Sequence, residues 1–188
     1  MTLLDSIMEA NRKFVHPGAL APLPKYPKKQ FAIFTCMDTR LVEFMEPAMG
    51  VKRGDAKVIK TAGNTIVDPI NGSAMRSLVA GIFTLNVDEV FVVGHEDCGM
   101  SAVEPEKVKH AMIKRGISPE AIDKYAPDLV KWLGAFNCPE DNVIDVVGKI
   151  RKHPLIPKNV PVHGLIFSPN DGHLTILVNG YEAEGFEK

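Results

Sequence analysis

Short apolar runs recur along the chain and alternate with segments of helical or turn-forming character. The runs are rich in Val, Ile and Phe and are bounded by polar or turn residues, which predicts β-strands. They cover Phe31–Cys36, Ala56–Thr61, Glu89–Gly94, Val162–Phe167 and His173–Val178. The last run follows a turn-forming stretch, Ser168–Gly172, so it is predicted to return as an antiparallel edge strand.

Helical patterns lie between these runs. A short helical piece is predicted at Leu41–Met49, a longer helix at Ile70–Asn86, and several helical pieces over residues 100–153. Ser118 followed by Pro119 is typical of a helix start. This alternation predicts an α/β fold, with a mainly parallel four-stranded sheet, an added antiparallel edge strand and helices on both faces.

The N-terminal region is predicted to form an arm. Residues 2–14 have the pattern of an amphipathic helix, and the proline-rich stretch His16–Lys29 predicts an extended connector. We therefore divide the chain into an arm, residues 1–29, and an α/β domain, residues 30–188. The arm helix could pack on a neighbouring subunit or on its own domain.

The charge of the chain is nearly balanced, with 22 basic and 23 acidic residues and a net charge of −1 among 188 residues. Nucleic acids need a positive surface and anionic membranes attract polybasic runs, so we expect neither as a partner. No apolar stretch approaches membrane-spanning length, and the N-terminus lacks the basic-then-apolar order of a signal peptide. The three cysteines are too few for a disulfide framework and fit a reducing compartment. We therefore expect a cytoplasmic protein.

Metal-binding and charged side chains follow two of the predicted strands directly. Met37-Asp38-Thr39-Arg40 follows Cys36, and His95-Glu96-Asp97-Cys98 follows Gly94. Buried charge is costly, so a core strand seldom ends this way without a use. Open parallel sheets bind ligands beyond the carboxyl ends of strands, where the strand order reverses. If the first and third strands are neighbours and the second pairs on the other side of the first, both strand ends meet at such a point.

The residue types at these ends predict a metal site. Zinc binds thiolate and imidazole, and a catalytic zinc keeps one tetrahedral position open. Cys36, His95 and Cys98 supply three ligands, so we expect one Zn²⁺ per chain. An iron–sulfur cluster would need four cysteines, and Cys138 lies in a separate helical region. Blue copper would need two histidines. A Cys36–His95 nucleophile–base pair stays possible but gives Cys98 no role.

Asp38 and Arg40 are predicted to act as a catalytic pair beside the metal. Zinc with two thiolates and a neutral imidazole is close to neutral, so its bound hydroxide and Asp38 together add negative charge. Arg40 can balance Asp38 through a bidentate hydrogen bond. We therefore expect Asp38 to have a low pKa and to orient zinc-bound hydroxide as an acceptor. In a second arrangement, Asp38 would swing onto the zinc and close the fourth position.

The two motifs together resemble those of the β-class carbonic anhydrases, which carry a Cys-x-Asp-x-Arg and a His-x-x-Cys in this order. The likeness covers about residues 31–181 and extends through three further stretches, Gly54-Asp55-Ala56, Ala62-Gly63-Asn64 and His153-Pro154-Leu155-Ile156-Pro157. The chain looks like the shorter, compact subgroup of that family.

The resemblance implies a zinc lyase, carbonate dehydratase, that reversibly hydrates carbon dioxide to bicarbonate and a proton. It implies that Cys36, His95 and Cys98 bind the metal while Asp38 and Arg40 serve the reaction. It also implies a homodimer or a multiple of dimers. Thr61 stands where many members have Asn, and no match is found for the Gln that lines the pocket in plant-type members. The pocket therefore stays unassigned.

Two other functions are compatible with these residues. The same site could hydrolyse carbonyl sulfide or carbon disulfide, because only the pocket and its access route would differ. From another class, the zinc could be purely structural, in a scaffold or redox-sensing protein. A structural zinc predicts a closed set of four protein ligands.

Overall fold

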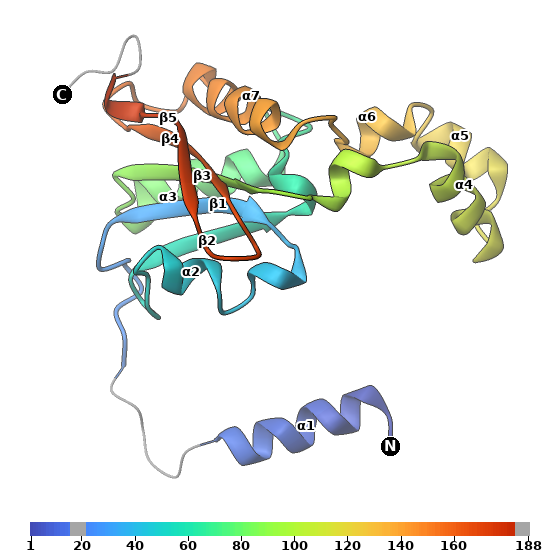
Figure 1. Ribbon diagram of the computed structural model, residues 1–188, viewed down its shortest axis with the longest axis horizontal. Helices are drawn as coiled ribbons and strands as arrows, with labels where there is room; N and C mark the ends of the chain where they lie inside the picture. Colours follow the sequence, from blue (N-terminus) through green and yellow to red (C-terminus); the bar gives the residue numbers. More distant parts are fainter. Residues whose placement is uncertain (16–21, 183–188) are drawn as a thin grey trace.

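The computed structural model describes residues 1–15 and 22–182 of the chain. Its centre is a five-stranded sheet with the strand order β2-β1-β3-β4-β5 (Figure 1). The strands are β1 (Phe31–Cys36), β2 (Ala56–Thr61), β3 (Glu89–His95), β4 (Val162–Phe167) and β5 (Leu174–Val178). Strands β1 to β4 pair in parallel, and β5 pairs antiparallel with β4. The predicted fold class is confirmed. Strand β1 lies between β2 and β3, which is the arrangement under which the two strand ends meet.

Helices surround the sheet and extend beyond it. They are α1 (Leu3–Phe14), α2 (Met45–Ala48), α3 (Ser73–Leu85), α4 (Pro105–Lys114), α5 (Pro119–Tyr125), α6 (Leu129–Leu133) and α7 (Pro139–Lys152). Figure 1 shows α4, α5 and α6 projecting from the body as a separate helical lobe. No helix among the described residues is both long enough and apolar enough to cross a bilayer.

The two faces of the sheet carry separate apolar layers, because successive side chains of a strand point to opposite faces. Ala32 and Phe34 of β1 belong to the layer that α3 and α7 cover. Ile33 belongs to the opposite layer, which the short helix α2 covers with Met45. Both layers are closed to water at their centres, since Ile33, Phe34 and Met45 each expose 0% of their surface.

The predicted strands agree closely with the observed ones, and the helix ends differ more. The predicted helix from Ile70 begins only at Ser73, because the Asp68 carboxylate accepts hydrogen bonds from the backbone N–H groups of Ile70 and Asn71 and forms a turn there. The predicted helical piece Leu41–Met49 is interrupted at Glu43, whose φ of 56° is left-handed. Residues 16–21 of the predicted connector lie outside the described residues, so the division of the chain at residue 29 stays a prediction.

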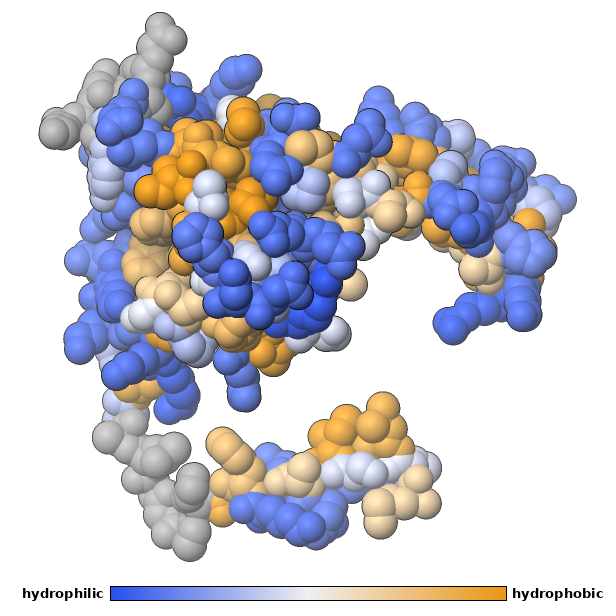
Figure 2. Space-filling model, in the orientation of Figure 1, coloured by the Kyte–Doolittle hydropathy of each residue, from blue (hydrophilic) through white to orange (hydrophobic). Residues whose placement is uncertain are grey.

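The arm helix α1 is well capped but unburied. Thr2 and Asp5 form a reciprocal capping box, and no residue of α1 is buried. Figure 2 shows apolar side chains gathered along one side of this helix, where Leu3, Leu4 and Ile7 are 79%, 67% and 56% exposed. The predicted amphipathic helix is confirmed, and its apolar side is uncovered in a single chain.

A buried histidine lies at the other end of the sheet from the strand ends singled out above. His163 of β4 stacks on the Phe91 ring at 4.7 Å. Its Nδ1 accepts a hydrogen bond from the Gly180 N–H at 3.1 Å, and its Nε2 lies 2.8 Å from Glu89 Oε1. The ring therefore accepts at Nδ1, and protonation would set two N–H groups against each other there. Burial lowers the pKa of His163, against a weaker opposing effect of Glu89.

This lowered pKa predicts a loss of stability in acid. Below about pH 6.5 the unfolded chain binds a proton at residue 163 that the folded chain does not bind, so the free energy of unfolding falls as the pH falls. We expect His163→Gln to flatten this dependence between about pH 7 and 5, by at most about 1.4 kcal/mol per pH unit. Urea unfolding in the presence of a chelator measures it. The exposed His110 supplies the control, since His110→Gln should leave the slope unchanged. Equal slopes for all three proteins would contradict the prediction.

Candidate metal centre

Three soft donor atoms converge where β1 and β3 end. Cys36 is the last residue of β1, His95 is the last of β3, and Cys98 follows in the next turn. Their ligand atoms all lie within 4.8 Å of one another, and all three residues are buried. The two sulfur atoms are 4.0 Å apart, close to the about 3.8 Å that tetrahedral zinc with 2.3 Å bonds would require. The three residues therefore fit a tetrahedral metal ion.

The ring of His95 is oriented as in many metal-binding histidines. Its Nδ1 lies 2.8 Å from the Glu96 carbonyl oxygen, so Nδ1–H donates there and Nε2 keeps its lone pair. Nε2 is buried and has no hydrogen-bond partner among the described residues. An orphaned buried nitrogen is costly unless a ligand satisfies it, and here it faces the two sulfur atoms.

The two thiols differ in acidity. The hydrogen bond from Cys98 to the Cys36 sulfur, against the opposing effect of burial, lowers the pKa of Cys36 to about 4. The same hydrogen bond, together with burial, raises the pKa of Cys98. Cys36 is thus ready to bind a cation as a thiolate, and Cys98 would lose its proton on binding one.

Asp38 and Arg40 lie at the rim of this cluster and form the predicted pair. Arg40 Nε donates to Asp38 Oδ1 at 3.0 Å, and Nη2 donates to Oδ2 at 2.8 Å. The side-chain hydrogen bond from Arg40 is the main cause that lowers the pKa of Asp38 to about 2. Asp38 Oδ2 also lies 3.7 Å from His95 Nε2. The carboxylate is therefore ionised, held in place and turned towards the metal-binding atoms.

Asp97 is a further partner of Arg40 that sequence reasoning missed. Arg40 Nη1 donates to Asp97 Oδ2 at 2.8 Å, and Nη2 donates to the Asp97 carbonyl oxygen at 2.7 Å. Asp97 stands between His95 and Cys98, so Arg40 links the loops that follow β1 and β3. The sequence signal was present, since an aspartate follows each of the two strand ends and Arg40, two residues after Asp38, can pair with both.

The backbone at Gly63 also contacts the centre. The Gly63 N–H donates to Cys36 Sγ at 3.3 Å. Gly63 has a φ of 64°, and a Cβ there would lie 2.7 Å from Phe136 Cε1 and 2.8 Å from Met100 Cβ. Only glycine fits this conformation and this space.

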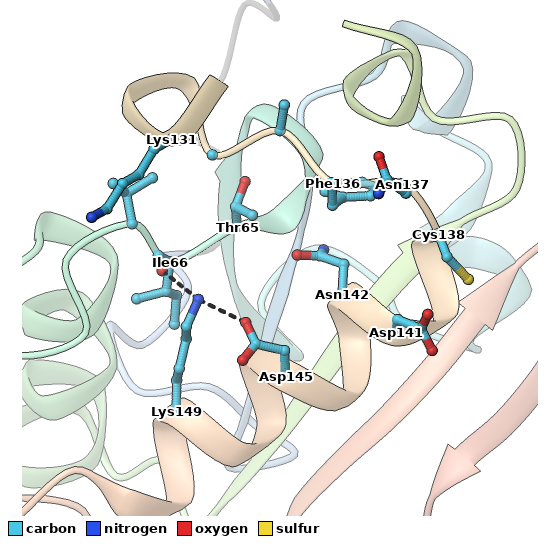
Figure 3. A pocket seen from close by; sticks show the side chains of 13 residues that line it. Thr65, Ile66, Lys131, Phe136, Asn137, Cys138, Asp141, Asn142, Asp145 and Lys149 are labelled. Atoms are coloured by element: carbon cyan, nitrogen blue, oxygen red, sulfur yellow. Dashed lines mark hydrogen bonds and ion pairs between the residues drawn. The ribbon is translucent and has the colours of Figure 1, made fainter. Parts of the chain in front are cut away.

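Two cavities adjoin the segment around Gly63. One, of about 410 Å³, opens directly onto Cys36, Cys98 and the Asp38–Arg40 pair, with apolar walls that include Met37, Ala62 and Met100. The other, of about 470 Å³, is larger but contains none of the predicted site residues. It lies between the start of α7, the connector of residues 134–138 and the segment of residues 65–67 (Figure 3). Of these two cavities, the first is the one that adjoins the predicted site residues.

Cys138 takes no part in the centre. Its thiol lies 3.0 Å from Glu140 Oε2 at the start of α7, and it is absent from the metal-binding cluster found among the described residues. The structure thus brings together all five predicted site residues and leaves the third cysteine apart.

Known proteins are similar to this chain in sequence and in fold. The family model for carbonic anhydrase matches residues 31–174, most of the chain. The chain belongs to the β-carbonic anhydrase family. The carbonic anhydrase candidate YtiB of Bacillus subtilis is 44% identical over 186 residues, which cover 96% of this chain and 99% of YtiB.

Two further relatives extend this comparison. The crystal structure of β-carbonic anhydrase isoform I from Trichomonas vaginalis matches with a TM-score of 0.92 and 46% identity, covering 96% of this chain and all of that one. A carbon disulfide hydrolase of Acidithiobacillus thiooxidans is 31% identical over 153 residues, which cover 76% of this chain and 74% of that protein. This β-carbonic anhydrase is therefore an enzyme of the family for which carbon dioxide hydration is the expected reaction.

The tight space at Gly63 predicts a strong effect of one added methyl group. We expect Gly63→Ala to lower the free energy of unfolding by about 2–4 kcal/mol, because the left-handed backbone and the contacts with Phe136 and Met100 both resist a Cβ. Urea unfolding measures this change. Gly99→Ala is the matched control, since nothing lies within 4 Å of a Cβ at that position, and it should change stability by less than about 0.5 kcal/mol. Two equal effects would show that the space at Gly63 is not restrictive.

Proposed function

We propose that this chain catalyses the zinc-dependent, reversible hydration of carbon dioxide to bicarbonate in the cytoplasm. The observation that carries the proposal is a buried set of three soft donors, Cys36, His95 and Cys98, with no fourth ligand in the cluster among the described residues. A catalytic zinc takes three protein ligands and keeps one position for water or substrate, whereas a structural zinc is closed by four. The donor set therefore favours a catalytic role over a structural one.

The residues of the centre would have two roles, metal binding and orientation of the nucleophile. Cys36, His95 and Cys98 would hold the zinc ion, which when bound would acidify a water molecule and so supply hydroxide at a usable pH. Asp38 would accept a hydrogen bond from that nucleophile and so fix its direction of attack. Because its pKa is about 2, Asp38 stays a pure acceptor and does not take the proton away.

Arg40 would serve by holding Asp38. Swinging Asp38 onto the metal would break the two side-chain hydrogen bonds from Arg40. The backbone N–H of Arg40 adds a third bond to Asp38 Oδ1 at 2.8 Å. These bonds favour the open arrangement over the closed one. The cavity beside the pair, with methionine and alanine walls, would admit a small uncharged substrate.

Carbon disulfide hydrolysis is the second candidate, because one relative at 31% identity bears that name. We propose carbon dioxide as the substrate ahead of carbon disulfide, because the relatives at 44% and 46% identity are described as carbonic anhydrases. Rates measured on carbon dioxide, carbonyl sulfide and carbon disulfide with one zinc-loaded sample decide between the two. Hydrolysis of a sulfur substrate without carbon dioxide hydration would overturn the preference.

The assigned roles predict two different kinds of loss. Cys36→Ser and His95→Ala should lose zinc and activity together, because each removes a ligand. Asp38→Ala should keep about one zinc per chain and lose at least about a hundredfold in kcat/KM, because the orienting acceptor is gone. Zinc content and stopped-flow hydration rates on the same samples measure both effects.

Cys138 provides the control for this experiment. Cys138→Ser removes a thiol outside the centre and should change neither zinc content nor rate. A fully active Asp38→Ala would refute the orienting role. A zinc-loaded parent protein without hydration activity at any pH would favour a structural zinc.

We also propose that the chain forms a homodimer in which α1 packs on the partner subunit. The support is the uncovered apolar side of a helix that is itself well capped. An amphipathic helix gains most of its stability by burying its apolar side, and a second copy of the chain is always available to cover it.

Two substitutions at adjacent positions test this arrangement. Ile7→Asp places a carboxylate on the apolar side of α1, and Ser6→Asp places the same group on the polar side. Burying an isoleucine is worth about 1.5–3 kcal/mol, so Ile7→Asp should raise the dimer dissociation constant by more than about tenfold. Ser6→Asp should leave it unchanged. Sedimentation equilibrium measures both, and an unaltered dimer in Ile7→Asp would show that α1 does not join the subunits.

A further inference from the structure

Asn142 is a buried polar residue that none of the roles above explains. It lies near the beginning of α7, and only 5% of it is exposed. Its side-chain Nδ2 donates to the Gly63 carbonyl oxygen at 3.0 Å, across 79 residues of sequence. Figure 3 shows the amide projecting from α7 towards the segment that carries Thr65.

Gly63 connects this amide to the metal centre. The Gly63 carbonyl oxygen accepts the hydrogen bond from Asn142, and the Gly63 N–H donates a hydrogen bond to Cys36 Sγ. Gly63 and Asn64 both have left-handed backbones, with φ of 64° and 47°. Glycine has the widest conformational freedom of any residue, so the direction of its N–H depends on what fixes its neighbouring peptide group. The side chain of Asn142 does this.

We propose that Asn142 is a positioning residue for the metal-binding thiolate of Cys36, acting through the Gly63 peptide. This inference rests on the proposed metal centre. An N–H bond to a thiolate draws electron density from the sulfur, so it limits how much charge the sulfur gives to the metal. Hydrogen bonds of this outer kind commonly change metal affinity by about 10–100-fold. The bonds from Asn142 to Gly63 and from Gly63 to Cys36 thus make the metal affinity depend on how α7 packs against the sheet.

The test compares metal binding across variants of the full-length protein. Asn142→Ala removes the side-chain donor, whereas Asn142→Gln keeps an amide donor. The cavity of about 470 Å³ that Asn142 lines has room for the longer glutamine side chain. Asp141→Asn is the matched control, because Asp141 lines the same cavity and makes no bond to Gly63. If the alanine variant does not fold, Asn142→Leu replaces it, since leucine fills a similar volume without a donor.

Three readouts are taken on each variant. Chelator competition gives the zinc dissociation constant, which we expect Asn142→Ala to raise by about 10–100-fold. Cys36 is then no longer held in place for the metal, and this loss outweighs the stronger electron donation by its sulfur. Asn142→Gln should return the constant towards the parent value. Cobalt(II) loading gives the thiolate-to-cobalt absorption band, which should move to longer wavelength in Asn142→Ala, because a thiolate without its N–H donor gives up an electron more easily. Thermal unfolding of the metal-free protein reports any purely structural effect, and Asp141→Asn should match the parent in all three.

The outcomes separate this inference from the function on which it rests. A lowered melting temperature in Asn142→Ala with the zinc affinity and the cobalt band of the parent would overturn the positioning role and leave the metal centre intact. A parent protein that binds neither zinc nor cobalt would overturn the metal centre itself, and the positioning role with it.

Discussion

The parallel pairing of β1 with β3 places the chemistry of this chain. Their register sets Thr35 opposite Val93, so Cys36 and His95 leave the sheet at the same edge. Both strands are buried along most of their length, and a buried strand has no place for a charged or metal-binding side chain except at its end. The candidate metal centre therefore lies at the ends of the two strands, where polar side chains can leave the apolar core. It needs both strands, because neither strand end supplies three ligands.

Arg40 stabilises this edge of the sheet by pairing with two carboxylates, Asp38 and Asp97, that differ in their exposure to water. Asp97 is 87% exposed at its side chain, so its ion pair with Arg40 is well screened by water. Asp38 is 17% exposed, so its pair with Arg40 forms in a less polar environment and holds its charge more firmly. The less exposed pair is thus the stronger one and fixes the Asp38 carboxylate. The exposed pair and the bond to the Asp97 carbonyl only direct the guanidinium towards the loop after β3. The Arg40 side chain thus joins the loops that follow β1 and β3, and it keeps Asp38 ionised by lowering its pKa.

The sequence predicted the strands, and it predicted five candidate site residues that the structure brings together, because both follow from local pattern. Continuous apolar runs mark the strands, and the end of each run is where Cys36 and His95 stand. It did not predict the contacts that depend on loop geometry or on distant packing. Asp97 reaches Arg40 from a left-handed backbone with a φ of 50°, and Asn142 reaches Gly63 only because α7 packs on the sheet. Helix starts were less well predicted, since the Asp68 turn competes with the helix for the same backbone N–H groups.

The close packing of α7 on the sheet accounts for the reach of Asn142. Gly94, the residue before His95, has no side chain towards this helix, and a Cβ there would lie 2.5 Å from Val143 Cγ2. Val143 is fully buried and follows Asn142 directly in α7. Any larger residue at position 94 would push Val143, and with it Asn142, away from Gly63. The absence of a side chain beside His95 thus brings α7 close enough for Asn142 to bond the Gly63 peptide, whose N–H contacts Cys36. The core and the candidate metal centre therefore depend on the same position of α7.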